Sequence, residues 1–198
     1  MVSVRSMIQE DPADAFLTRR APTVGAIDAR LSVWGQAARE AVQRRAEALA
    51  DAAALLVERT GRRAERLPKA PVDPGLALLD PEVADLVSLA ATLLPEAVQR
   101  SCRLLWVDPD KLRGVLREAL DPAVESARVE IRRRQALYRR RARLWQHDPA
   151  RLDRLREELE SLRVPKGGDQ ARDQILRGLM ALLVVENTPV QSPVDSHP

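Results

Sequence analysis

The sequence predicts an all-α protein, a helical bundle with long amphipathic helices. Of its 198 residues, 45% are hydrophobic, with alanine and leucine prominent, and only 3% are aromatic, a mixture that favours helices over sheets. No run of β-branched residues alternates with polar residues, as it would in a half-buried strand. The dipeptide Asp-Pro occurs six times, and five of the six precede a helical pattern. Because aspartate caps helices and proline suits their first position, these dipeptides predict helix starts.

Residues 1–67 are predicted to form a short helix at 11–20 and, after a break, a much longer helix at 24–67. The apolar residues of the long helix recur at close to heptad spacing, which predicts one buried seam. Two glycines, Gly35 and Gly61, weaken this helix, and either could bend it. The predicted seam consists of Ile27, Leu31, Trp34, Ala38, Val42, Leu49, Ala52 and Leu56.

A proline-rich segment, 68–79, is predicted to link this region to a helical bundle at 80–186. The first helix of the bundle is strongly apolar and is expected to begin at Asp80 and to be kinked or split at Pro95. The last residues, 187–198, contain proline and serine without hydrophobic periodicity, which predicts a disordered tail.

The second half of the bundle is predicted to contain an antiparallel C-terminal hairpin. A short helix at 108–120 precedes an arginine-rich helix at 121–147, which Asp121 is expected to cap. The next helix, 148–164, carries leucines on one face, and the connection between the two is short enough to predict antiparallel packing. A last helix, capped by Asp169, is apolar on most sides, so it is either buried centrally or meets another subunit. The side chains expected inside the hairpin are Ile131, Tyr138 and Trp145.

The helix at 121–147 concentrates positive charge, with eight arginines against three acids in a chain whose net charge is only +3. Four arginines recur at spacings of 4, 7 and 4 residues, so they fall on one flank of the helix beside its apolar seam. Two more lie further round the helix. A row of guanidinium groups suits a run of phosphates, since each can donate two parallel hydrogen bonds to phosphate oxygens. This arginine stripe consists of Arg128, Arg132, Arg139 and Arg143, widened by Arg133 and Arg140.

Three interpretations of the arginine stripe stay open: contact with a nucleic-acid backbone, contact with an acidic protein, and a plain solvated face. Arginine outnumbers lysine 29 to 3 throughout the chain, as expected of a GC-rich coding sequence, so codon usage contributes to the stripe. Arg44 and Arg45 interrupt the seam of the long helix and are predicted to add a second contact region. The candidate nucleic-acid-binding residues are therefore Arg128, Arg132, Arg133, Arg139, Arg140, Arg143, Arg44 and Arg45.

The few aromatic residues are interpreted as core residues. Single-strand binding proteins often stack bases on exposed rings, but here the rings coincide with apolar seams. A bound nucleic acid would then be held by its backbone, with little reading of sequence. The residues concerned are Trp34, Trp106, Tyr138 and Trp145.

The sequence carries no motif for catalysis, so no enzyme, cofactor or metal site is predicted. There are two histidines and one cysteine, Cys102, which excludes an internal disulfide or a cysteine metal cluster. Cys102 falls on an apolar helical face and is interpreted as a buried structural thiol. The first ten residues are not followed by the apolar segment of a signal peptide, and no apolar run reaches the ~18 residues of a membrane span. A cytoplasmic protein is predicted.

A small, basic, all-helical protein of this kind resembles the small subunits of Cascade-type CRISPR effector complexes. The likeness is carried by the arginine stripe from Arg128 to Arg143 and by the helical hairpin around it. It implies a non-catalytic subunit of a ribonucleoprotein complex, repeated along a guide-RNA filament, that holds RNA or single-stranded DNA by its phosphates and contacts other subunits and copies of itself. The competing interpretation is a protein-only helical adaptor, scaffold or assembly chaperone, which would use the same arginines against acidic groups.

Overall fold

The computed structural model describes residues 22–60, 66–67, 71–102, 108–162, 164 and 169–187. The predicted helix at 11–20, the side chain of Cys102, Trp106 and the predicted tail after Asn187 lie outside the described structure. Throughout the described ranges the regular elements are helices and no strand is present, which confirms the all-α helical bundle. The helices are α2 (Val24–Thr60), α3 (Pro74–Leu79), α4 (Val83–Cys102), α5 (Pro109–Leu144), α6 (Pro149–Ser161) and α7 (Asp169–Asn187).

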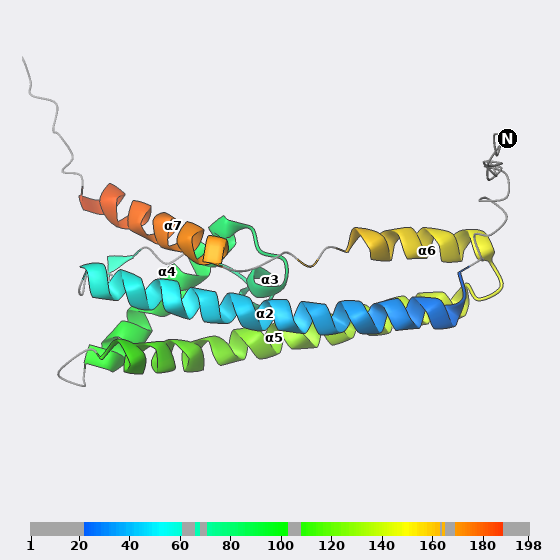
Figure 1. Cartoon of the computed structure of the whole chain (residues 1–198), viewed down its shortest axis with the longest axis horizontal. Coiled ribbons are helices and arrows are strands. Elements are labelled where there is room, and N and C mark those ends of the chain that lie inside the picture. The colour runs from blue at the N-terminus through cyan, green and yellow to red at the C-terminus, as the bar shows by residue number, and fades with distance from the viewer. Residues whose placement is uncertain are drawn as a thin grey trace, which may run out of the picture.

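The two longest helices, α2 and α5, run antiparallel side by side along the whole length of the molecule (Figure 1). The 37 residues of α2 give it a length of about 55 Å at 1.5 Å per residue. Helices α4 and α7 pack at the end of this rod where α2 finishes and α5 begins, α3 lies near its middle, and α6 lies at the opposite end (Figure 1).

The seam predicted for α2 is confirmed, because seven of its eight residues are buried and Trp34 is half-buried. The helix passes through Gly35 without interruption and is described as far as Thr60; Gly61 lies outside the described residues. Gly35 is buried where the amide side chain of Gln135 crosses from α5, so a glycine allows the two helices to approach closely there.

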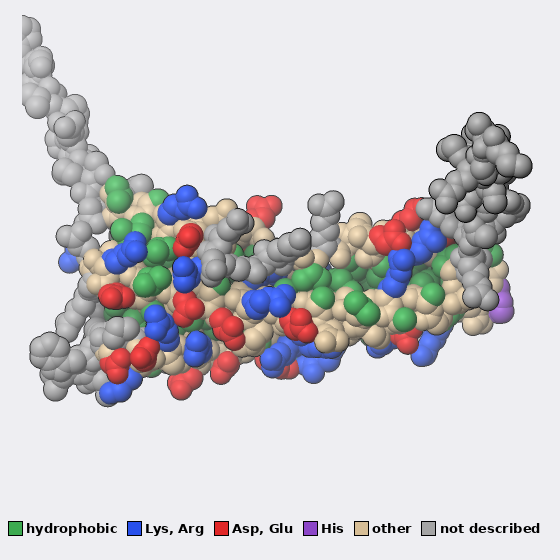
Figure 2. Space-filling view, viewed as in Figure 1, with side chains coloured by type: hydrophobic (Ala, Val, Ile, Leu, Met, Phe, Trp, Pro, Cys, Tyr) green, Lys and Arg blue, Asp and Glu red, His purple; other side chains and the backbone are tan. Residues whose placement is uncertain are grey.

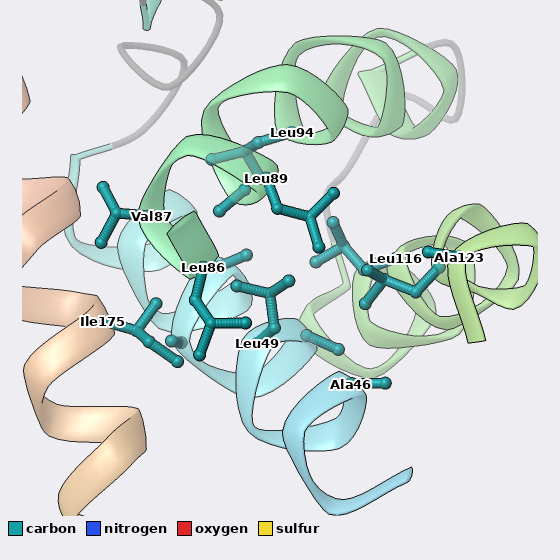
Figure 3. Packing of buried hydrophobic residues seen from close by; sticks show 14 of the residues in the cluster. Ala46, Leu49, Leu86, Val87, Leu89, Leu94, Leu116, Ala123 and Ile175 are labelled. Carbon is teal, nitrogen blue, oxygen red and sulfur yellow. The ribbon is translucent and has the colours of Figure 1, made fainter. Parts of the chain in front are cut away.

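The main core lies between the second half of α2, the first half of α5 and the helices α3, α4 and α7. Figure 3 shows Leu49 of α2, Leu86 of α4 and Leu116 of α5 directed into a shared interior, with Ile175 of α7 beside them. All four side chains are nearly inaccessible to solvent. Burying a side chain of this size contributes about 2 kcal/mol, so this end of the rod carries most of the hydrophobic stabilisation.

A second, smaller cluster fills the other end of the rod, where α6 turns back beside α5 (Figure 1). Its buried members are Ile27, Leu31, Ala142, Leu152, Leu155 and Leu159. The predicted antiparallel C-terminal hairpin is confirmed, and Tyr138 and Trp145 pack half-buried against this cluster. Ile131 was wrongly assigned to the hairpin and belongs to the main core. The leucines of α6 are covered by α2 as well as by α5, so α6 meets a smaller part of α5 than predicted.

The arginine-rich helix is not a separate element, since α5 runs unbroken from Pro109 to Leu144 with Pro122 inside it. The predicted cap at Asp121 is therefore wrong, whereas Asp108 does cap α5 by accepting from the N–H of Asp110 at 3.0 Å. The apolar face continues past the proline, so packing holds the helix together although Pro122 cannot donate one backbone hydrogen bond. The buried residues on both sides of it are Leu112, Leu116, Leu120, Ala123, Val124 and Ala127.

Residues 74–79, inside the predicted linker 68–79, form the short helix α3. Asp73 caps it by accepting hydrogen bonds from the N–H groups of Gly75 and Leu76, at 2.9 and 3.1 Å. The last turn of α3 is buried in the main core against α5. This part of the predicted linker is thus a core element, and α2 shares one core with the helices of 80–186.

Helix α4 begins at Val83 rather than at the predicted Asp80, which follows the last residue of α3. It continues through Pro95, so the predicted split does not occur. One face of α7 is buried in the main core against α2 and α4, which matches the central-burial alternative, while Val184 on its other side is exposed. The buried residues of α7 are Ile175, Leu176, Leu179 and Leu183.

Candidate nucleic-acid interface

The candidate interface is the arginine-rich end of α5, where residues 128–143 contain eight arginines and one glutamate. It extends from the middle of the rod, where Ile131 still belongs to the main core, to the end of α5 at which the chain turns into α6. Figure 2 shows basic and acidic side chains interspersed over the visible face of the rod, with basic ones prominent along the edge formed by α5. How much of the positive charge is already compensated therefore decides what this surface can bind.

The continuity of α5 keeps four arginines of the stripe on one flank, as predicted from their spacing. Arg133 and Arg140 project further round the helix, away from its buried face. Of the six, Arg139 is half-buried and the others are exposed. The four that share the flank are Arg128, Arg132, Arg139 and Arg143.

Four of the six predicted arginines form ion pairs within the chain. Arg128 and Arg132 both reach Glu125, at 3.6 and 2.7 Å. Arg133 lies 3.6 Å from Glu130. The stripe is thus partly neutralised by acids of the same helix.

Arg139 completes the paired set by binding Asp28 of α2, and it also donates to Ser32. Arg140 and Arg143 differ, because both are exposed and neither has a side-chain partner among the residues that the structure describes. These two arginines are therefore the unpaired members of the predicted stripe.

The ion pairs of this surface are weak enough to exchange for another anion. Exposed pairs contribute between about 0 and 1 kcal/mol, and Arg132 and Glu125 are 63% and 55% exposed. Six of the eight arginines of 128–143 share five carboxylates, and Arg140 and Arg143 pair with none in the described structure, so the positive charge exceeds the negative charge by three. The five carboxylates are those of Asp28, Asp80, Glu125, Glu130 and Glu158.

Two further arginines of α5 connect helices. Arg134 donates to Glu130 at 3.0 Å and to Asp80 at 2.6 Å, which ties α5 to the end of α3. Burial by itself would lower the pKa of Arg134, but its hydrogen bonds to Asp80 and Glu130 outweigh burial and raise the pKa. Arg141 donates to Glu158 of α6 at 3.3 Å and lies over the ring of Tyr138. Both side chains hold neighbouring elements in place.

The second predicted contact region at Arg44 and Arg45 does not form one surface. Arg44 is exposed and lies 3.8 Å from Glu40. Arg45 is buried, and its Nη1 donates to the carbonyl oxygens of Leu78 and Leu79 at 2.8 and 2.9 Å, at the end of α3. Desolvation by burial lowers the pKa of Arg45. The prediction of a nucleic-acid contact at Arg45 was wrong, because this side chain completes the C-terminal turn of a buried helix.

Two grooves beside α6 were not predicted from the sequence. One, of about 520 Å³, lies against α5 and combines arginines with the ring of Tyr138, which the sequence assigned to the core. The other, of about 360 Å³, is mostly apolar and lies between α2 and α6. The first is lined by Glu130, Arg133, Arg134, Leu137, Tyr138, Arg141 and Leu162. The second is lined by Ala29, Arg30, Val33, Trp34, Leu159, Glu160 and Leu162.

The described part of the chain contains no group of three or more His, Cys, Asp or Glu side chains arranged to hold a metal ion. Within the same residues, no helix combines the length and the apolar character needed to cross a bilayer. Comparisons with protein-family models, with curated proteins and with solved structures found no match to this chain.

Proposed function

We propose that this protein is a non-catalytic helical subunit that binds the phosphate backbone of RNA or single-stranded DNA through the arginine-rich end of α5. The observation that supports this is the excess of eight guanidinium groups over five carboxylates on residues 128–143 and their neighbours. Arg140 and Arg143 can bind phosphate without first breaking an ion pair. Arg128 and Arg132 can exchange the carboxylate of Glu125 for a phosphate, because their ion pairs are exposed.

The proposed contact is short, since 15 residues of helix separate Arg128 from Arg143, or about 22 Å at 1.5 Å per residue. A contact of this length engages few phosphates, and a single copy binds weakly. The proposal therefore includes the assembly that the resemblance to Cascade-type small subunits implies, a ribonucleoprotein complex in which several copies and other subunits line one strand and gain affinity through multivalency. The proposed compartment is the cytoplasm.

A salt titration tests this function directly. Fluorescence anisotropy of the full chain with labelled single-stranded RNA, single-stranded DNA and duplex DNA should show binding at low salt. The logarithm of the association constant should fall with the logarithm of salt concentration by about 0.7 per phosphate contacted on a single strand, so four contacts give a slope of about −3. An absence of binding to every probe at low salt would refute the proposal.

A second candidate function, a protein-only adaptor, scaffold or assembly chaperone, is favoured by the apolar groove between α2 and α6. Val33 is 71% exposed at that groove, and Trp34 and Leu162 are half-buried beside it. Exposed apolar surface with a polar rim is typical of protein contacts. The titration separates the two functions, because an adaptor of this kind would bind none of the nucleic-acid probes.

A further inference from the structure

The groove against α5 lies on a different flank of that helix from Arg128, Arg132, Arg139 and Arg143, although Arg133, which widens the stripe, also lines the groove. At about 100° per residue, the side chains that line it from α5 are centred roughly opposite to Arg132 and Arg139 around the helix axis. The groove has a volume of about 520 Å³ and extends from Glu130 to Arg141. It is large enough for a group of the size of a nucleotide, and the residue that follows α6, Leu162, forms part of its lining.

The groove brings three guanidinium groups together around apolar surface. Arg133 is 82% exposed, and its ion pair with Glu130 is long at 3.6 Å, so its guanidinium can move toward a ligand. Arg134 and Arg141 are held by their carboxylate partners and provide fixed positive charge at the wall. The apolar part is Leu137, which is 47% exposed although it is a large hydrophobic residue.

Tyr138 adds a ring to this apolar surface. Its side chain is half-buried, packing against the smaller core cluster on one side and lining the groove on the other. The guanidinium carbon of Arg141 lies 5.8 Å from the centre of the ring. A planar cation beside an aromatic ring offers stacking surface to a further planar group.

A ligand that fits this groove must have a flat, largely apolar part and an adjoining anion. An unstacked nucleobase with its phosphate has both, whereas a base in a duplex is stacked and paired and presents only its edge. A peptide segment of acidic residues alone would satisfy the arginines but would leave Leu137 and the ring of Tyr138 without a matching group.

We infer that this groove accepts an unstacked base of a single strand, with the base against Leu137 and Tyr138 and the neighbouring phosphate on Arg133. The inference rests on the proposed function, since the same end of α5 holds the strand. It also makes the proposed function more specific, because a groove that accepts an unstacked base gives a preference for single strands over duplexes. The aromatic residue then contributes to binding although most of its surface supports the fold.

Photochemical crosslinking to the full chain tests where the base lies. A single-stranded thymine oligonucleotide carrying one iodouracil is bound at low salt and irradiated, and the protein is digested with trypsin. The label is expected on the peptide from Gln135 to Arg139, which contains Tyr138. If the oligonucleotide binds but the label is found on another peptide, the proposed base site in the groove is wrong and backbone binding still stands. If no oligonucleotide binds, both the base site and backbone binding are wrong.

A pair of matched variants provides a second test that does not disturb the core. Leu137→Glu places a carboxylate in the groove, and Val184→Glu places one at an exposed apolar position of α7, outside the groove and on a different helix from the arginine stripe. The first change should weaken single-strand binding at least tenfold and the second no more than about threefold, since both add one carboxylate at an exposed apolar position and only the first lies in the groove. Equal effects, or equal affinity of the unchanged protein for single strand and duplex, would contradict the inference.

Discussion

Replacing Gly35 with alanine should destabilise the protein by about 2 kcal/mol, although alanine is the better helix former. A Cβ atom at this position would lie 2.0 Å from Nε2 and 2.6 Å from Cδ of Gln135. Gln135 is buried and donates to the carbonyl oxygen of Leu31 at 2.8 Å, so its amide has no room to retreat without losing this bond.

The magnitude follows from three terms. Leaving a buried amide without its partner costs about 1–3 kcal/mol, and forcing extra volume between packed helices costs a similar amount, about 1–3 kcal/mol. The gain in helix propensity from glycine to alanine returns about 1 kcal/mol. The net loss lies between about 1 and 5 kcal/mol, with relaxation of the amide favouring the lower half.

Urea unfolding followed by far-ultraviolet circular dichroism measures this change in the free energy of unfolding. Gly114→Ala in α5 is the matched control, because among the described residues no atom from outside the surrounding turns of the helix lies within 4 Å of a Cβ at that position, and it should stabilise by about 0.5–1 kcal/mol. The double variant Gly35→Ala with Gln135→Ala should lose less stability than the two single changes together, since the clash is gone. If Gly35→Ala is as stable as the unchanged protein, the close approach of α2 and α5 at this point is wrong.

Two further predictions concern stability. Arg45→Met should lower the free energy of unfolding by about 2–4 kcal/mol, because the carbonyl oxygens at the end of α3 lose a buried donor. Arg44→Met, at the neighbouring exposed position, should change it by less than about 0.5 kcal/mol. Similar losses for the two variants in urea unfolding would contradict the assignment of Arg45 to the core. Pro122→Ala should raise the thermal midpoint and stabilise by about 1–3 kcal/mol, because it restores a backbone hydrogen bond inside α5; a helix that began at Pro122 would gain nothing from this change.

The periodic spacing of apolar residues predicted the helices and their buried faces well. The Asp-Pro dipeptides predicted where helices begin less well. The seam of α2 followed from residue spacing alone, because a repeated apolar face must be buried along its whole length. Asp108 and Asp121 carry the same Asp-Pro signal, but only Asp108 caps a helix. At Asp121 the buried face of α5 continues from Leu120 to Ala123, and the gain from packing exceeds the effect of one proline.

The candidate site was harder to predict because ion pairs depend on residues distant in the sequence. Arg139 meets Asp28, which lies 111 positions away, and Arg134 meets Asp80, which lies 54 positions away. No spacing rule connects such pairs. Arg45, in contrast, falls on the same face as the seam of α2, so its burial could have been predicted from the periodicity that identified the seam.

The most direct test of the central claim compares two charge reversals on α5. Arg140→Glu with Arg143→Glu removes the unpaired arginines of the stripe, and Lys111→Glu with Arg117→Glu makes the same change in net charge at exposed positions near the other end of the helix. Anisotropy with a single-stranded oligonucleotide at moderate salt should show a loss of more than about tenfold for the first pair and little change for the second, since each lost phosphate contact weakens binding locally. Equal losses would mean that only net charge attracts the strand, and no loss in either variant would mean that nucleic acid does not bind at the arginine-rich end of α5.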